Sequence, residues 1–88
     1  MRVEIYSLKK ILFEGNASSL NCKTARGEVT VLEDHEPFIS MLAEGPVKVA
    51  RSGAAAGAGG NAQEEIFAVK GGFLEVNPEH VVRLLVEE

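Results

Sequence analysis

The sequence predicts an all-β fold, built as a sandwich or a barrel from short strands. Two observations lead to this prediction. Short apolar runs recur roughly every eight to twelve residues with turn residues between them, which is the spacing of such folds. No segment carries an apolar stripe with the period of an amphipathic helix. A chain of 88 residues has room for one small domain, which we place at residues 1–88.

The first third of the chain predicts four strands. Two of them alternate between apolar and polar residues, so each has one wet face, and the last is rich in β-branched residues, which favour strands. We expect turns or loops at Glu14–Asn16 and Ala25–Gly27, where glycine and asparagine interrupt the pattern. The four predicted strands are Arg2–Tyr6, Ile11–Phe13, Ala17–Thr24 and Glu28–Leu32.

The middle of the chain predicts three more strands and two polar corners. Proline removes a backbone donor, so the corners are placed where it follows charged residues, at Glu33–Pro37 and Glu44–Pro46. Ser52–Gln63 is rich in glycine and alanine, and we expect a flexible hairpin loop there, because glycine disfavours a stable helix. The predicted strands are Phe38–Leu42, Val47–Arg51 and Glu64–Val69.

The segment Ile66–Val86 contains three apolar runs separated by two tight turns. The turns are expected at Lys70–Gly72, where glycine accepts positive φ, and at Asn77–Glu79, where Pro78 fixes φ. Consecutive runs of this length predict a β-meander with one apolar face. A second sheet is then needed to cover that face.

Composition excludes several functional classes. A formal net charge of −4 argues against a nucleic-acid partner, since phosphate binding needs clustered lysine and arginine. Cys22 is the only cysteine, so neither an internal disulfide nor a thiolate zinc site is expected. We see no signal peptide and no apolar run near the roughly 20 residues of a spanning helix, and expect a soluble, cytoplasmic chain.

Catalytic and cofactor motifs are weak. Glu33, Asp34, His35 and Glu36 form an acidic cluster around an imidazole, but neighbours on an extended chain point to opposite faces and do not converge on one metal ion. Gly57–Ala62 fits a GxGxxA dinucleotide pattern, yet the segment after it reads as a strand rather than the helix that pattern requires. We therefore expect no enzyme activity, no metal and no cofactor.

Three blocks, in order and at near-matching spacing, resemble one known family. They are Leu12–Gly15, Gly27–Leu32 running into His35–Phe38, and Gly71–Val76. Together they are similar to the epsilon-subunit family of the bacterial and chloroplast F-type ATP synthase, the counterpart of the mitochondrial delta subunit. The resemblance covers essentially the whole chain and implies a two-sheet β-sandwich of about ten short strands.

The resemblance also implies a function and its contacts. It implies a non-catalytic central-stalk rotor subunit of a proton-translocating ATP synthase, held through that complex on the cytoplasmic face of the cell inner membrane. Such a subunit anchors gamma to the ring of c subunits and couples ion flow to ATP synthesis. The implied gamma-facing residues are Ser7, His35, Glu36, Pro37, Phe38, Gly71, Gly72 and Phe73. The implied ring-facing residues are Ala25, Arg26, Gly27 and Glu28.

The chain departs from the family pattern in three places. Glu33 and Asp34 stand where the family commonly has proline and glycine, and we expect Asp34 to accept the left-handed conformation of that turn. The Ser52–Gln63 loop is longer than usual. The family generally continues into a carboxy-terminal helical hairpin that restrains ATP hydrolysis, and this sequence stops at Glu88, so that role is not expected.

Two other functional classes stay open at this point. One is a free-standing β-sandwich that binds a small ligand or carbohydrate, which would need exposed aromatic platforms although Tyr6 is the only tyrosine and tryptophan is absent. The other is a small metal-dependent enzyme that uses the Glu33–Glu36 cluster. Measuring the metal content of the protein would separate a metal-dependent enzyme from the other functional classes.

Overall fold

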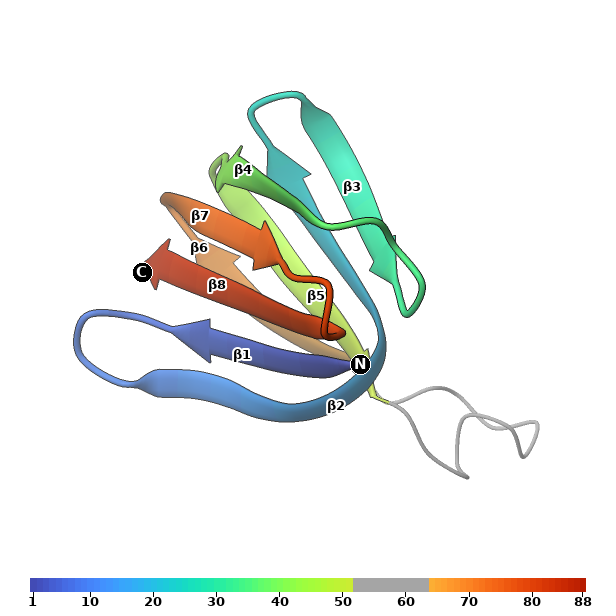
Figure 1. Cartoon of the computed structure of the whole chain (residues 1–88). Coiled ribbons are helices and arrows are strands. Elements are labelled where there is room, and N and C mark those ends of the chain that lie inside the picture. The colour runs from blue at the N-terminus through green and yellow to red at the C-terminus, as the bar shows by residue number, and fades with distance from the viewer. Residues whose placement is uncertain (52–63) are drawn as a thin grey trace.

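The chain folds as an all-β sandwich (Figure 1). The computed structural model describes residues 1–51 and 64–88, and all of the regular structure within them is strand. None of these residues belongs to a helix of the length and apolarity needed to cross a membrane. The strands are β1 (Arg2–Tyr6), β2 (Ile11–Thr24), β3 (Gly27–Leu32), β4 (Phe38–Leu42), β5 (Gly45–Arg51), β6 (Glu64–Val69), β7 (Gly71–Val76) and β8 (Val81–Glu87).

The strands form two layers joined by β2. One layer has the order β1-β8-β7-β4, and the other has the order β3-β2-β5-β6. The first half of β2 pairs with β1, and its second half pairs with β3 and β5. At its far end Thr24 of β2 also pairs with Leu42 of β4. Figure 1 shows the first layer in front of the second, with β2 running along one side of both.

The turn expected at Glu14–Asn16 is wrong, because β2 is one continuous strand of 14 residues. A bulge lies further on, between Ala17 and Ser19, where the register with β5 shifts by one residue. Side chains before the bulge are buried at Phe13 and Ala17, and after it at Leu20. An inserted residue flips the buried face and bends the strand, which carries β2 from one layer to the other. The described residues therefore form eight strands, not about ten.

The first link of the expected β-meander is also wrong. β7 and β8 form an antiparallel hairpin as predicted, but β6 pairs with β5 in the other layer. Only Lys70 separates β6 from β7, and its backbone N–H donates to the Glu87 carbonyl. Gly71 and Gly72 are the first residues of β7, and Gly72 has φ of 138°. This positive φ, open to glycine, lets the chain change layer within one residue.

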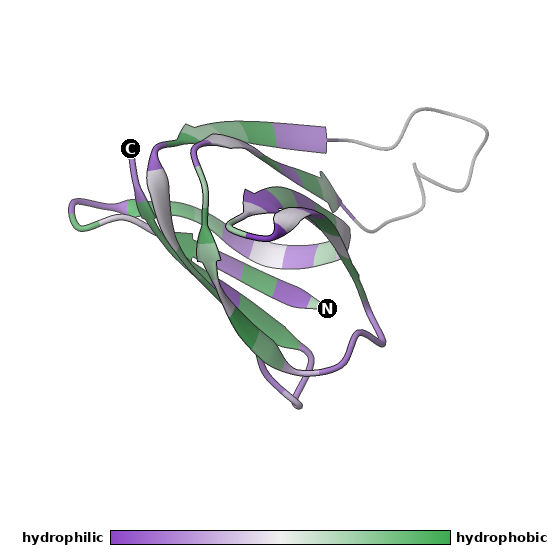
Figure 2. Cartoon of the chain, turned by 90° about the horizontal axis from the view of Figure 1, so that it is seen from above, coloured by the Kyte–Doolittle hydropathy of each residue, from purple (hydrophilic) through white to green (hydrophobic). Residues whose placement is uncertain are grey.

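The core lies between the layers and is built from inward-facing apolar side chains. Ile5, Leu84 and Leu74 occupy paired positions on β1, β8 and β7 and are fully buried. Phe13 and Phe67 meet edge to face, with ring centroids 6.3 Å apart, where β2 and β6 approach each other. Figure 2 shows green, apolar stretches concentrated along the strands and purple, hydrophilic ones at the connections. The alternation read from the sequence thus specifies which face is buried.

The hairpin expected between Val47–Arg51 and Glu64–Val69 is confirmed. β5 and β6 pair antiparallel, with Ala50 opposite Glu64. Arg51 donates to the Glu65 carboxylate at 2.8 Å and lies over the Phe13 ring at 5.4 Å. The connecting loop Ser52–Gln63, with its expected flexibility and its GxGxxA pattern, lies outside the described residues.

The Cys22 thiol is expected to be unreactive in the folded protein. Cys22 is fully buried, and this burial raises its pKa to about 11, so little thiolate forms at neutral pH. A colorimetric thiol assay at pH 8 should report almost no reaction natively and about one thiol per chain in denaturant. Rapid native labelling would contradict the packing of β2 described above.

Candidate functional site

Four exposed apolar side chains lie together on the outer face of the β1-β8-β7-β4 layer. We call them the apolar strip: Ile39 and Met41 on β4, Phe73 on β7, and Leu85 on β8. Phe73 pairs with Met41 on one side and Leu85 on the other, so they are neighbours. Their exposed fractions are 74%, 59%, 54% and 50% in sequence order. Contiguous apolar side chains across three strands are typical of a surface that another protein covers.

The apolar strip borders a shallow hollow of about 310 Å³. Its walls include Phe73 and Leu85 on one side and Glu75 and Arg83 on the other, with Tyr6 at the edge. A hollow of this size and depth suits a protruding side chain of a protein partner better than an enclosed small molecule.

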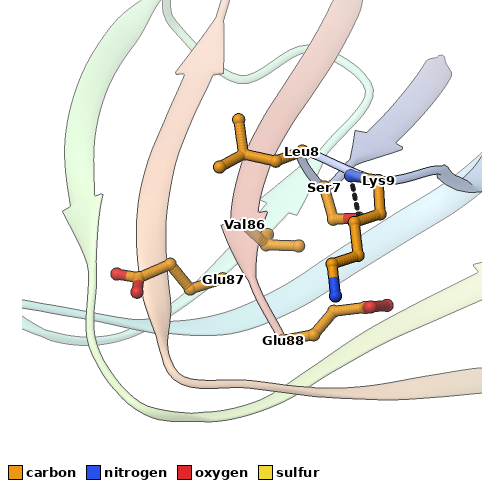
Figure 3. A pocket seen from close by; sticks show the side chains of 6 residues that line it. All are labelled: Ser7, Leu8, Lys9, Val86, Glu87 and Glu88. Atoms are coloured by element: carbon orange, nitrogen blue, oxygen red, sulfur yellow. Dashed lines mark hydrogen bonds between the residues drawn. The ribbon is translucent and has the colours of Figure 1, made fainter.

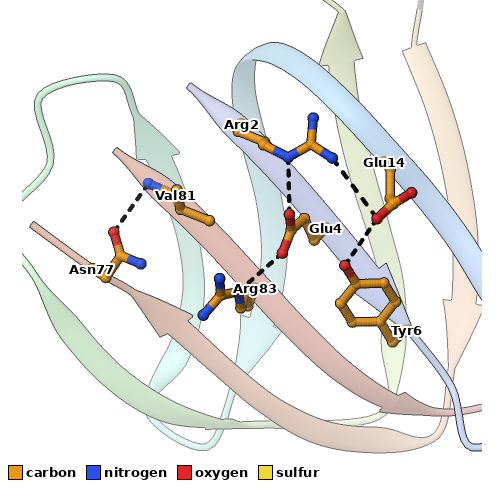
Figure 4. Close-up of polar contacts among 7 residues, drawn as sticks. All are labelled: Arg2, Glu4, Tyr6, Glu14, Asn77, Val81 and Arg83. Atoms are coloured by element: carbon orange, nitrogen blue, oxygen red, sulfur yellow. Dashed lines mark hydrogen bonds and ion pairs between the residues drawn. The ribbon is translucent and has the colours of Figure 1, made fainter. Parts of the chain in front are cut away.

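Next to the apolar strip, the same outer face carries a network of paired charges (Figure 4). Glu4 accepts hydrogen bonds from Arg2 at 2.8 Å and from Arg83 at 2.9 Å. Arg2 also lies 3.7 Å from Glu14, which accepts a hydrogen bond from the Tyr6 hydroxyl. The hydrogen bonds from Arg2 and then Arg83 hold the pKa of Glu4 below its usual range. These charges satisfy one another and fix the polar border of the face.

The predicted corner forms the connection between β3 and β4. The backbone N–H of His35 donates to the Leu32 carbonyl at 3.0 Å, which closes a tight turn. The centroid of the His35 ring lies 4.9 Å from that of the Phe38 ring. Glu36 and Pro37 are exposed, and Phe38 is half-buried at the start of β4. The corner therefore presents polar tips around one aromatic anchor.

The left-handed residue expected at Asp34 is found elsewhere. Among the described non-glycine residues, His80 alone has positive φ, at 64°. The His80 ring nitrogen Nδ1 lies 3.0 Å from the Glu33 carbonyl, which ties the Asn77–His80 turn to the corner. Asn77 supports that turn by accepting hydrogen bonds from the backbone N–H groups of Glu79 and Val81. Figure 4 shows the contact with Val81. The corner therefore needs no glycine, because neither Glu33 nor Asp34 takes positive φ.

The Glu33–Glu36 cluster does not converge. The Glu33 carboxylate accepts from the Met1 amino group at 2.9 Å, and this contact lowers the pKa of Glu33. The His35 ring instead lies 2.9 Å from the Glu36 carbonyl. Across residues 1–51 and 64–88, no three His, Cys, Asp or Glu side chains come together as metal ligands would. The structure thus adds no support to a metal-dependent enzyme.

The remaining predicted residues gather at the opposite end of the sandwich, which we call the Gly71 end. Strand pairing brings there the Ser7–Lys10 connection, the Ala25–Gly27 turn and Gly71–Gly72. The Ala25 N–H donates to the Met41 carbonyl at 3.0 Å, which holds the turn against the end of β4. Thr24 caps the turn, because its hydroxyl donates to the Gly27 carbonyl and accepts from the Arg26 N–H.

The Gly71 end also carries an exposed hairpin tip (Figure 3). Ser7 accepts a hydrogen bond from the Lys9 N–H, and Leu8 beside it is 94% exposed. The tip and the end of β8, at Val86–Glu88, border a hollow of about 220 Å³. This end therefore offers two separate projections, the hairpin tip and the Ala25–Gly27 turn.

The structure thus divides the eight predicted gamma-facing residues into three groups. Ser7, Gly71 and Gly72 lie at the Gly71 end, together with the predicted ring-facing residues Ala25, Arg26, Gly27 and Glu28. His35, Glu36 and Pro37 lie at the other end. Phe73 lies in the apolar strip, whereas Phe38, at the start of β4, packs its half-buried side chain against the core.

Sequence reasoning missed Ile39, Met41 and Leu85. Each stands at an outward position of its strand, where alternation predicts a polar residue. This mismatch was the available signal, because apolar residues on both faces of an antiparallel strand mark a second covered surface.

Comparison with known proteins gives one consistent result. The family model described as "ATP synthase, Delta/Epsilon chain, beta-sandwich domain" matches residues 1–88. A protein named ATP synthase epsilon chain from Acinetobacter baylyi is 36% identical over 87 residues, which are 99% of this chain and 56% of that protein. One of the same name from Chromohalobacter salexigens is 37% identical over 84 residues, 96% of this chain and 53% of that protein. The chain thus spans about half the length of these curated relatives.

Two solved structures share the fold. A chain of the Euglena gracilis mitochondrial ATP synthase, in a structure of OSCP, F1 and the c-ring, superposes with a TM-score of 0.80 at 24% identity. The superposition covers 98% of this chain and 49% of the Euglena gracilis chain. A chain of the Tetrahymena thermophila mitochondrial ATP synthase, in a structure of the central stalk and c-ring, superposes with a TM-score of 0.78 at 18% identity. This superposition covers 100% of the present chain and 63% of the Tetrahymena thermophila chain. At these low identities, the structural similarity shows that the fold is shared and nothing more.

Proposed function

Because the chain belongs to the ATP synthase delta/epsilon family of β-sandwich domains, we propose that it is a non-catalytic rotor subunit of a proton-translocating F-type ATP synthase. In this function it fastens the gamma subunit to the c-ring, so that ion flow stays coupled to ATP synthesis. It is held on the cytoplasmic face of the inner membrane through the complex. The observation that carries the proposal is the family match over residues 1–88, joined to an exposed apolar face on the same domain.

The apolar strip is the proposed gamma-facing surface. Burial of four exposed apolar side chains favours association, while the paired charges around Glu4 set orientation. Phe73 lies at the centre, between Met41 and Leu85, where interface energy usually concentrates. The His35–Phe38 corner extends this surface at one end.

The Ala25–Glu28 segment makes the Gly71 end the proposed ring-facing surface, and Ser7, Gly71 and Gly72, which are expected to face gamma, lie at its border. Its Ala25–Glu28 segment is exposed, the capping Thr24 behind it is buried, and the Ser7–Lys10 hairpin projects beside it. Polar, hydrogen-bonded projections suit the polar loops of a c-ring better than an apolar pocket would. The two surfaces differ in direction, because one is a sheet face and the other is an end of the sandwich.

Phe73→Asp is expected to weaken gamma binding at least about tenfold, because a carboxylate would be buried without a partner at the centre of the face. Phe38→Ala should weaken it less, since Phe38 is half-buried against the core. Titration of labelled protein with the purified gamma subunit of the same ATP synthase measures both dissociation constants.

Ile66→Asp is the matched control. Ile66 is 59% exposed, close to the value for Phe73, but lies on β6 in the other layer. This variant should bind gamma like the wild type. Equal affinity of wild type and Phe73→Asp would remove the apolar strip as the gamma-facing surface.

A further inference from the structure

A groove of about 560 Å³ runs between β3 and β4, separate from the hollow beside Phe73. It reaches from the Ala25–Gly27 turn, in the proposed ring-facing surface, to the His35–Phe38 corner, in the proposed gamma-facing surface. Its floor and walls are mainly apolar. The residues that border it are Thr24, Ala25, Arg26, Val29, His35, Phe38, Ile39, Ser40 and Met41.

The groove exists because β4 has almost no strand partner on that side. β4 pairs with β7 along its length, but on its other edge it pairs with β2 only at Thr24 and Leu42. The Met41 carbonyl on this edge accepts from the Ala25 N–H. Backbone groups alternate along a strand, so those of Ile39 point to the same edge, where none of the strands in the described part of the chain pairs with them. An extended segment laid there finds backbone partners.

Arg26 gives the groove its charge. Within residues 1–51 and 64–88, Arg2, Arg51 and Arg83 each form an ion pair with a glutamate, whereas Arg26 forms none. Among the described residues, no carboxylate borders the groove, and His35 is the one titratable side chain there besides Arg26. In a protein of net charge −4, this places an uncompensated guanidinium beside an apolar channel. A guanidinium in such a setting suits a carboxylate, which it binds with two parallel hydrogen bonds.

We infer that the groove holds an extended segment of the gamma subunit, with apolar side chains over Val29 and Phe38 and a carboxylate paired with Arg26. This inference rests on the proposed function and names the chemistry of its partner. Gamma is the occupant because Ile39 and Met41 belong to both the groove and the apolar strip, so one partner covers both without a break. Arg26 is then the one residue of the proposed ring-facing segment whose side chain contacts gamma, while Ala25, Gly27 and Glu28 still face the ring.

The test is a charge series at Arg26 in the full chain. Arg26→Gln and Arg26→Glu should weaken gamma binding, by about tenfold for the reversal, and Arg26→Lys should weaken it least. The loss should shrink at high salt, since screening already weakens the wild-type contact. Arg26 is exposed, so thermal unfolding of the three variants should match the wild type.

Lys9→Glu is the control, because it makes the same charge change at an exposed site of the Gly71 end that does not border the groove. It should leave gamma affinity within about twofold of the wild type. Equal effects of Lys9→Glu and Arg26→Glu on gamma would overturn the inference. So would an effect of Arg26→Glu on binding to the detergent-solubilised c-ring alone. Failure of the wild type to bind gamma at all would remove the proposed function together with it.

A cross-link identifies the segment. Cys22 is buried, so Ser40→Cys introduces one accessible thiol at the groove. In the complex with gamma and the c-ring, a short thiol-to-amine cross-linker should join it to a gamma peptide that contains aspartate or glutamate. Attachment to the c subunit instead would contradict the assignment.

Discussion

Gly72→Ala should abolish the cooperative fold. Gly72 has φ of 138°, a conformation that alanine rarely adopts. A Cβ there would overlap the Leu85 carbonyl oxygen and lie 2.8 Å from the Val86 Cα, both of which are backbone atoms of β8. Relief would require the β7–β8 ladder to separate beside the core. We expect a loss of about 4 kcal/mol or more, close to the whole stability of a domain of this size, roughly 4–13 kcal/mol.

Gly27→Ala separates the two causes of that loss. Gly27 also has positive φ, at 119°, but a Cβ there meets nothing within 4 Å. Its cost is therefore conformational strain alone, about 1–3 kcal/mol. Circular dichroism melts of both variants measure the difference. A folded Gly72→Ala variant with the melting temperature of Gly27→Ala would show that β7 does not approach β8 as described.

Leu84→Ala should cost about 3–4 kcal/mol of stability, or roughly 15–25 °C in melting temperature. Leu84 is fully buried on β8 between Ile5 of β1 and Leu74 of β7. Removing its side chain leaves a cavity in the middle of a three-strand row. The two neighbours are held by backbone pairing and cannot collapse into the space, so the loss lies in the middle of the usual range of about 2–5 kcal/mol and not at its lower end.

Leu85→Ala is the control, since it is the same substitution one residue along the same strand. Leu85 points outward and is 50% exposed, so we expect a loss below about 1 kcal/mol. Urea unfolding monitored by circular dichroism gives both values. Similar midpoints for the two variants would mean that β8 does not present alternate faces to core and solvent.

Much of the strand layout was readable from the sequence because strand periodicity is local. Alternation in Arg2–Tyr6 and Val47–Arg51, and the corner at Glu33–Pro37, depend on neighbouring residues alone, and the structure confirms them. The errors involve pairing between distant segments. The bulge at Ala17–Ser19 needs β5 to reveal it, and the jump from β6 to β7 depends on where β5 and β8 lie.

The candidate site was only partly predictable for the same reason. Phe73 and Phe38 stand inside motifs that a family resemblance highlights. Ile39, Met41 and Leu85 form a surface only once β4, β7 and β8 are placed in register, because they come from distant parts of the chain. Within residues 1–51 and 64–88, the free edge of β4 and the lack of an ion pair at Arg26 likewise depend on how all the strands are placed.

The shared strand β2 has a mechanical consequence. A sideways load that slides one layer of an ordinary sandwich over the other works against apolar contacts, which yield in shear. Here the sliding layers pull on a single backbone, since β2 is bonded to β1 in one layer and to β3 and β5 in the other. Covalent bonds resist stretching far more stiffly than side-chain contacts resist slipping. Such a domain would transmit a sideways force between two bound partners with little internal deformation.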